Sequence, residues 1–167
     1  MADVLGEVVR SFSSTLRGTL VFSGRSTIRD VIYFWLAAGL VTLPVYSAIL
    51  ATLAWDEAVI ARLTMEALIS LPFFALFIRR LHDQDRTGWW ILMLPPLMAF
   101  NVYQTIHVSF AVLDPQWSPV AVQGQAWGLL LLPFGAASVL FMFLPGTIGP
   151  NQHGPDPRKG GGAAAAT

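Results

Sequence analysis

The chain has 167 residues, of which 54% are hydrophobic and only 12% are charged, and its formal net charge is zero. Soluble globular chains carry roughly 25% charged residues, so this composition is typical of a protein whose surface faces lipid. The balanced charge gives no sign of a nucleic-acid partner, and the absence of cysteine excludes disulfides and thiolate metal sites.

The N-terminal segment, residues 1–22, is predicted to form an amphipathic helix at the membrane surface. Its apolar side comprises Leu5, Val8, Val9, Phe12, Leu16 and Leu20, and its polar side comprises Glu7, Arg10, Ser14 and Arg17. Because acidic and polar residues occupy the place of an apolar core, the segment does not resemble a cleavable signal peptide. A helix on the cytoplasmic leaflet and a helix docked on protein both need such a face, and the sequence leaves both open.

Four apolar segments are each near the ~20 residues that a helix needs to cross ~30 Å of hydrocarbon. We place these spans at about residues 31–54, 58–78, 89–113 and 126–144. They are apolar all round rather than along one face, which favours a membrane protein over a soluble helical bundle. The predicted fold class is an all-α integral membrane protein, with four transmembrane helices in residues 23–157 and an interfacial N-terminal helix.

The basic residues predict the orientation of these spans. Nine of the ten lie before the first span, between the second and third spans, or after the fourth. By the positive-inside rule, these connections and both termini are predicted to be cytoplasmic. Only Arg62 lies near the other side, where Asp56, Glu57 and Asp114 are also found.

The connection between the second and third spans has the sequence RRLHDQDRTGWW, from Arg79 to Trp90. Arg79 and Arg80 are predicted to end the second span, because cations are stabilised by a helix C-terminus and by anionic headgroups. Thr87 and Gly88 then turn the chain. Trp89 and Trp90 are predicted to anchor the third span at the interface.

A polar cap is predicted on the cytoplasmic face, formed by this connection, the segment SGR and the turn-rich strap that follows the fourth span. It comprises Arg25, Arg29, Arg79, Arg80, His82, Asp83, Asp85, Asn151, His153 and Asp156. We expect its carboxylates to pair with its arginines, and Asn151 and Asp156 to bond exposed backbone ends of helices. Residues 158–167, rich in glycine and alanine, are predicted to be disordered.

The same cap contains residue types that suit a metal or an acid-base site. His82, Asp83 and Asp85, with His153 and Asp156 on the same face, are ligand types for zinc or manganese. A carboxylate beside a histidine also suits proton transfer. No second motif supplies a nucleophile or a phosphate cradle, so we assign no catalytic residue, metal or cofactor, and an enzyme is the least favoured class.

The third span carries polar residues at intervals of three, namely Asn101, Gln104 and His107. Polar groups within lipid usually face a bundle interior or a water-filled cavity. We interpret them as helix contacts. The alternative is a small-solute or ion transporter or channel subunit, which needs an oligomer or a partner to complete a pore.

Three ordered motifs carry a family resemblance. They are SGR followed by Arg29 and an aromatic pair, then RRLHDQDRTGWW, then GTIGPNQHGPDP after the fourth span. Together they resemble the DUF805 family (domain of unknown function 805) of small bacterial inner-membrane proteins, over about Val21 to Pro157. His153 departs from the family pattern, which has an aromatic or similar bulky residue there. The resemblance implies the bacterial inner membrane and implies no activity.

From these observations we expect a membrane scaffold or accessory protein whose cytoplasmic polar cap binds a partner or anionic lipid. Its partners are then the lipid bilayer and either further copies of the chain or another membrane protein.

Overall fold

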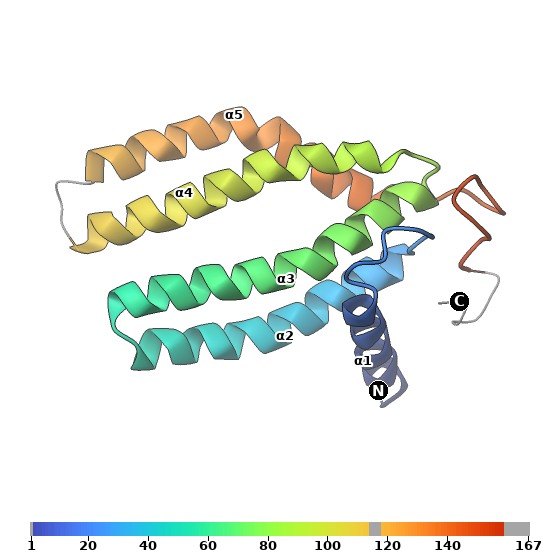
Figure 1. The fold of residues 1–167 in the computed structure, drawn as a ribbon, viewed down its shortest axis with the longest axis horizontal. Helices are drawn as coiled ribbons and strands as arrows, with labels where there is room; N and C mark the ends of the chain where they lie inside the picture. Colours follow the sequence, from blue (N-terminus) through green and yellow to red (C-terminus); the bar gives the residue numbers. More distant parts are fainter. Residues whose placement is uncertain (1, 114–117, 159–167) are drawn as a thin grey trace. The chain divides into compact units, whose positions relative to one another are not determined.

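The computed structural model describes residues 2–113 and 118–158 and is built from helices (Figure 1). In chain order these are α1 (Ala2–Arg17), α2 (Ile28–Thr52), α3 (Trp55–Asp83), the 3-10 helix η1 (Gly88–Met93), α4 (Leu94–Leu113) and α5 (Ser118–Phe143). Within the described residues no strand forms, and a single isolated bridge joins Asn151 to Gly154. The predicted all-α fold class is confirmed.

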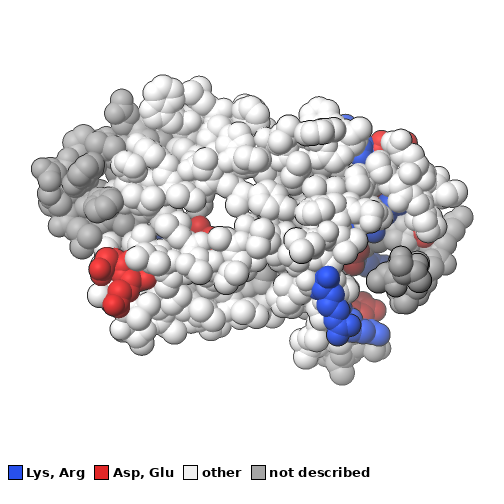
Figure 2. Space-filling model, in the orientation of Figure 1, with Lys and Arg blue, Asp and Glu red and all other residues white. Residues whose placement is uncertain are grey.

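The long helices have the length and composition of membrane spans. In the part of the chain that the structure describes, four segments qualify: Ile28–Thr52, Trp55–Asp83, Gly88–Val108 and Ala126–Phe143. Only 11% to 17% of the residues in their most apolar stretches are buried inside the protein. Apolar side chains therefore cover the outside of these helices, and Figure 2 shows a surface that is largely uncharged. Such a surface is stable in lipid, so the chain is a multi-pass membrane protein.

The connection between the second and third spans differs from the prediction at both of its ends. α3 continues past Ile78 to Asp83, so the first five residues of the charged motif, 79–83, lie in a helix rather than in a loop. The reason is an ion pair between Arg80 and Asp83, which lie three residues apart on one helix face. The third span begins as η1, and Pro95 and Pro96 then lie in the first turn of α4, where a missing N–H is tolerated.

The N-terminus of α2 is held by a reciprocal cap. Thr27 N donates to Asp30 Oδ2 at 2.8 Å, and Asp30 N donates to Thr27 Oγ1 at 3.4 Å. This arrangement satisfies backbone donors that the first turn of a helix leaves without partners. Ser11 Oγ of α1 donates to the same carboxylate at 3.3 Å, so the cap also holds α1.

The C-terminus of α3 ends in a Schellman motif. Arg86 N donates to Leu81 O and Asp85 N donates to His82 O, both at 3.0 Å. Asp85 adopts the left-handed conformation that this motif requires, with φ of 58°. The chain therefore turns sharply out of the helix at Asp85.

The chain divides into two compact units. The first comprises Met1–Val41, Ile69–Ile91 and Leu140–Thr167, and the second comprises Thr42–Leu68 and Leu92–Val139. The first unit contains nine of the ten basic residues, and the second contains Arg62 alone. The charge asymmetry of the sequence therefore coincides with a structural division.

Within the first unit, α1 packs against the beginning of α2. Phe12 stacks on Phe34 with ring centroids 5.8 Å apart, and Tyr33 Oη donates to Glu7 at 3.0 Å. These contacts reach only the first turns of α2, and Figure 1 shows α1 running across that end of α2 rather than along it. If α2 spans the membrane, α1 lies at the level of the membrane surface.

The topology is testable because the chain has no cysteine. Glu57 lies in the first turn of α3, a helix of 29 residues, and Thr87 lies four residues after its end; both are exposed. Such a helix is ~43 Å long and exceeds the ~30 Å of the hydrocarbon core. In intact cells, an impermeant maleimide is expected to label only one of the single variants Glu57→Cys and Thr87→Cys. Labelling of both from outside would contradict a membrane-spanning α3.

Candidate functional site

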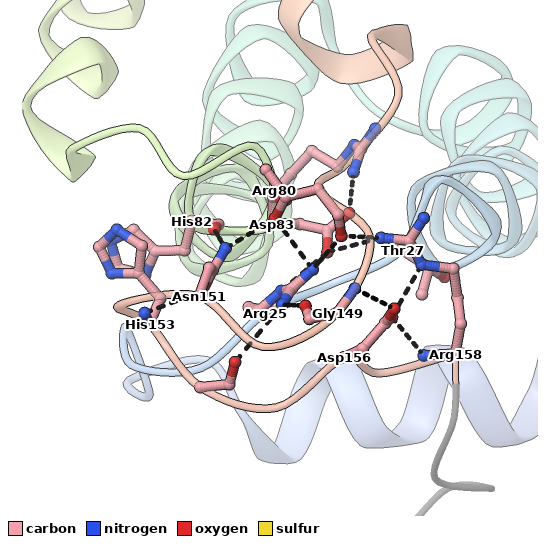
Figure 3. A network of polar contacts seen from close by, with 12 residues as sticks. Arg25, Thr27, Arg80, His82, Asp83, Gly149, Asn151, His153, Asp156 and Arg158 are labelled. Carbon is pink, nitrogen blue, oxygen red and sulfur yellow. Dashed lines mark hydrogen bonds and ion pairs between the residues drawn. The ribbon is translucent and has the colours of Figure 1, made fainter.

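Asp83 is the centre of a buried polar network at the end of α3 (Figure 3). Its Oδ1 accepts hydrogen bonds from Arg25 Nε at 3.0 Å and Nη2 at 2.8 Å, and its Oδ2 accepts one from Arg80 Nη1 at 2.5 Å. The side chains of both arginines are 1% exposed and that of Asp83 is 2% exposed. A buried charge without a partner costs several kcal/mol, so each of the three charged groups requires the others.

The two arginines also bind the chain that follows α5. Arg80 Nε donates to Met142 O at 2.9 Å, and Arg80 Nη2 donates to Leu144 O. These carbonyls belong to the end of a helix and have no helical partner. Arg25 Nη1 donates to Gly149 O, and its Nη2 to Thr147 O, both at 2.7 Å. The arginines therefore join three separate segments of the chain.

The strap in turn satisfies the last carbonyls of α3. Thr147 N and Oγ1 both donate to Asp83 O, at 2.8 and 3.0 Å. Asn151 Nδ2 donates to His82 O at 2.9 Å. This is the kind of contact with a helix end that the sequence analysis assigned to Asn151.

Gly146 permits the close approach of the strap to α3. A methyl group built on Gly146 would lie 1.8 Å from Asp83 Oδ2 and 3.0 Å from Asp83 O. Any larger residue would push the strap away from the carboxylate. The glycine at the start of the GTIG stretch is therefore required by packing rather than by flexibility.

Asp156 acts within the strap, and not at a helix end as predicted. Its Oδ2 accepts from Gly149 N at 2.9 Å, and its Oδ1 accepts from Arg158 N at 3.0 Å and Nε at 2.9 Å. The backbone N–H of Gly149, followed by the donors of Arg158, lowers the pKa of Asp156 to about 2. The carboxylate therefore remains charged and holds the strap closed at neutral pH.

Arg158 belongs to this network, and the prediction that it begins a disordered tail is wrong. Its Nη2 donates to Thr147 O at 2.7 Å and lies 3.5 Å from Asp83 Oδ1. The two carboxylates hold this arginine, which composition alone does not reveal. The rest of the predicted tail, residues 159–167, lies outside the described residues.

His82 and His153 stack on one side of the network. Their ring centroids are 3.9 Å apart and their planes differ by 4°. His82 Nδ1 lies 3.2 Å from Gly24 O. The nitrogen lone pairs of a histidine lie in the plane of its ring. Because the two rings are parallel and stacked, their lone pairs do not point towards a shared metal ion. His153 thus fills the bulky position of the motif by packing on the ring of His82.

Three residues of the predicted cap lie outside the network. Arg29 and Asp85 are exposed, and neither forms an ion pair within the described residues. Asp85 instead terminates α3 through its backbone conformation. The guanidinium of Arg79 packs on Gly18 just beyond α1, where a methyl group would lie 2.5 Å from Nη1.

The chemistry of the network is structural. Both oxygens of the Asp83 carboxylate accept from guanidinium groups, which leaves this carboxylate unsuited to act as a base or a ligand. Across the described residues, no three or more His, Cys, Asp or Glu side chains are grouped to hold a metal ion. The geometry therefore gives no support to the metal and acid-base interpretations.

The polar residues predicted within the third span separate in the structure. Asn101 and Gln104 line a cavity in the second unit. His107 instead contacts its own helix, with Nδ1 2.9 Å from Tyr103 O and its ring stacked on Tyr103 at 4.0 Å. The predicted interface anchors are both exposed, and the ring of Trp90 also packs against Phe141 at 5.2 Å.

Several network residues were missed by sequence reasoning. They are Gly146, Thr147, Gly149, Gly154 and Arg158, together with Gln84, whose Nε2 donates to Phe141 O. The available signal is the stretch GTIG, residues 146–149, which begins the third family motif, GTIGPNQHGPDP. Backbone carbonyl acceptors, however, carry no side-chain signature.

Comparison with known proteins agrees with the motifs. The family model described as "Protein of unknown function (DUF805)" matches residues 19–155 of the chain. No curated protein and no solved structure matches it significantly. The family match confirms the resemblance carried by the three motifs.

Removal of the Asp83 charge is expected to destabilise the fold. Asp83→Asn leaves Arg25 and Arg80 buried without their counterion, which costs about 3 to 5 kcal/mol for a buried pair. The thermal unfolding midpoint of the purified protein in detergent should fall clearly. Asp85→Asn is the matched control, because asparagine tolerates a positive φ and the side chain is exposed, so a change within about 0.5 kcal/mol is expected. Equal midpoints for the two variants would contradict the central role of Asp83.

The close packing of the strap gives a second test. Gly146→Ala should lower the unfolding midpoint because its methyl group overlaps the Asp83 carboxylate. Gly39→Ala, inside α2, is the control: a methyl group there has nothing within 4 Å, and alanine stabilises a helix by up to about 1 kcal/mol over glycine. A Gly146→Ala protein as stable as the Gly39→Ala protein would show that the strap does not pack closely on α3.

Proposed function

We propose that the chain, which belongs to the DUF805 family of proteins of unknown function, is a scaffold or accessory protein of the bacterial inner membrane that seats α1 on anionic lipid. The observation that carries this proposal is the exposed apolar face of α1. The polar cap contributes by holding the ends of the helices together.

The exposed face of α1 is a continuous apolar stripe. Leu5, Val9 and Leu16 recur at helical spacing and are 62%, 58% and 45% exposed. The neighbouring side chains of Val8 and Thr15 are buried against the rest of the first unit. One side of α1 therefore packs on protein, while an adjacent apolar side has no partner within the described residues.

Basic residues flank this stripe. Arg10 and Arg17 are exposed on the polar side of α1, seven residues apart and thus on one face. An amphipathic helix with apolar side chains on one side and arginines beside them is typical of a helix in the plane of an anionic leaflet. The packing of α1 across the beginning of α2 supports the same position.

The polar cap itself is a less suitable binding surface. The charges of Arg25, Arg80 and Asp83 are buried and bonded to one another and to the strap. A ligand would have to replace these internal bonds at a large cost. We therefore assign lipid binding to α1 and a structural role to the buried part of the cap.

The orientation follows from the distribution of charge. The first unit, with nine of the ten basic residues, is proposed to face the cytoplasm, where the leaflet is anionic. Thr87→Cys should then become reactive towards the impermeant reagent only after the membrane is opened.

Lipid seating of α1 is tested with hydrogen exchange on the full chain in nanodiscs. Amides of residues 2–17 are expected to exchange more slowly when phosphatidylglycerol is mixed into phosphatidylcholine. The double variant Arg10→Gln/Arg17→Gln should lose this gain, because each basic residue near an anionic surface contributes about 1 kcal/mol, or roughly 30-fold in protection for the two. Arg86→Gln, beyond α3, is the matched charge control.

The outcome that would overturn the proposal is equal exchange of α1 in both lipid compositions. Slower exchange that persists in the double variant would also contradict it. The first outcome would show that α1 does not contact anionic lipid, and the second would show that Arg10 and Arg17 do not mediate the contact.

A further inference from the structure

The second unit contains a cavity of about 360 Å³ formed by α2, α3 and α4. A volume of roughly 300 to 1,000 Å³ is usual for small-molecule sites. Its polar or partly polar lining comprises Tyr46, Trp55, Arg62, Asn101, Gln104 and Thr105. The cavity thus gathers the only basic residue of this unit and two of the three polar residues of the third span.

Arg62 is held in place but keeps a donor available. Its Nε donates to Glu66 Oε1 at 2.8 Å, and its Nη1 donates to Tyr46 Oη at 3.4 Å. The guanidinium carbon also lies 5.5 Å from the centre of the Tyr46 ring. Its Nη2 forms no hydrogen bond within the described residues. A guanidinium positioned by two neighbours with one free nitrogen is prepared to bind an anionic oxygen.

Gln104 supplies the complementary group. Its Oε1 is buried and has no hydrogen-bond partner among the described residues. A buried acceptor without a partner costs about 1 to 3 kcal/mol, so a ligand that brings a donor would gain from binding here. Arg62 can therefore donate a hydrogen bond to a ligand, and Gln104 Oε1 can accept one from it.

The position of the cavity in the helices explains how a polar ligand can enter a membrane protein. Trp55 begins α3, and Arg62 lies about two turns further on, or ~10 Å along the helix. The cavity thus extends from a helix end into the outer part of a span. Figure 2 shows a hollow with acidic atoms inside it in an otherwise uncharged part of the surface. Ionisable groups at such a depth usually mark a ligand or ion site.

We propose that this cavity binds a small phosphodiester monoanion that carries hydroxyl groups, of the glycerophosphoglycerol type. Arg62 binds a phosphate oxygen through Nη2, and a hydroxyl of the ligand donates to Gln104 Oε1. The carboxylate of Glu66 balances the positive charge of Arg62. Its negative charge also repels ligands that carry more than one negative charge. The same chemistry, a singly charged phosphodiester with glycerol hydroxyls, is present in soluble glycerophosphoglycerol and in the headgroup of phosphatidylglycerol.

The experiment uses the full chain in phosphatidylcholine nanodiscs and two probes. In one arm, binding of labelled glycerophosphoglycerol, a soluble phosphodiester with one negative charge, is measured by equilibrium dialysis. In the other, phosphatidylglycerol is added to the nanodiscs, and the lipid retained by the released protein is measured by native mass spectrometry. Binding in the first arm alone identifies a soluble ligand. Retention in the second arm alone identifies a lipid headgroup, provided that it persists in Arg10→Gln/Arg17→Gln, which removes lipid held by α1.

The variants give effects of opposite sign. Arg62→Gln should weaken binding at least about tenfold, because a hydrogen bond to a charged group is lost. Glu66→Gln should strengthen it several-fold, because the arginine is no longer neutralised. Gln104→Leu should weaken it, and Arg29→Gln, an exposed arginine of the first unit, should leave it unchanged.

The opposite signs keep the test decisive if one variant is unstable. If Arg62→Gln fails to fold, a gain in Glu66→Gln with a loss in Gln104→Leu still supports the site, since misfolding does not increase affinity. Absence of binding in both arms would overturn the proposal. Weaker binding in both Arg62→Gln and Glu66→Gln would also overturn it, because the pair would then be only structural.

Discussion

The ion pairs of Asp83 with Arg25 and Arg80 are the interaction on which the rest of the first unit depends. They bring together the segment before α2, the end of α3 and the chain after α5. Each partner is nearly fully buried, so the charges are stable only when all three segments are in place. The position of the strap, and through it the bonds of Asn151 and Asp156, follows from this requirement.

Charged side chains are buried or partly buried at two places in this apolar chain, the network around Asp83 and the cavity at Arg62. Their hydrogen bonding differs. In the network around Asp83, the charged groups are bonded to one another and to backbone carbonyls, and the buried atoms that lack a partner among the described residues, Gln84 Oε1 and His153 Nε2, lie outside the ion pairs. In the cavity of the second unit, Arg62 keeps a free nitrogen and Gln104 a buried acceptor without a partner. A matched set of polar groups stabilises a fold, whereas an unmatched set is what a ligand can complete. The bonding of the charged groups, together with the cavity beside Arg62, is the physical basis for assigning structure to the network and binding to the cavity.

Much of the fold and part of the candidate site were accessible from the sequence. The apolar segments, the amphipathic start and the three motifs could be found because hydropathy and helical period are local properties. The residues of the network were largely named, but Arg158 was placed in a tail, and Asp85 was expected to form an ion pair. The predicted ion pair of Asp85 is wrong, because the role of this residue depends on its backbone conformation and not on its charge.

The sequence by itself determined that the chain is an all-α membrane protein of this family, because composition and motif order carry that information. Only the tertiary structure decided which charges meet. Arg25 and Asp83 are 58 residues apart, and Arg25 and Gly149 are 124 apart. Such pairings depend on how helices and loops pack, and many of the acceptors are backbone carbonyls that every residue possesses. For the same reason, only the fold could separate Asn101 and Gln104, which line a cavity, from His107, which does not.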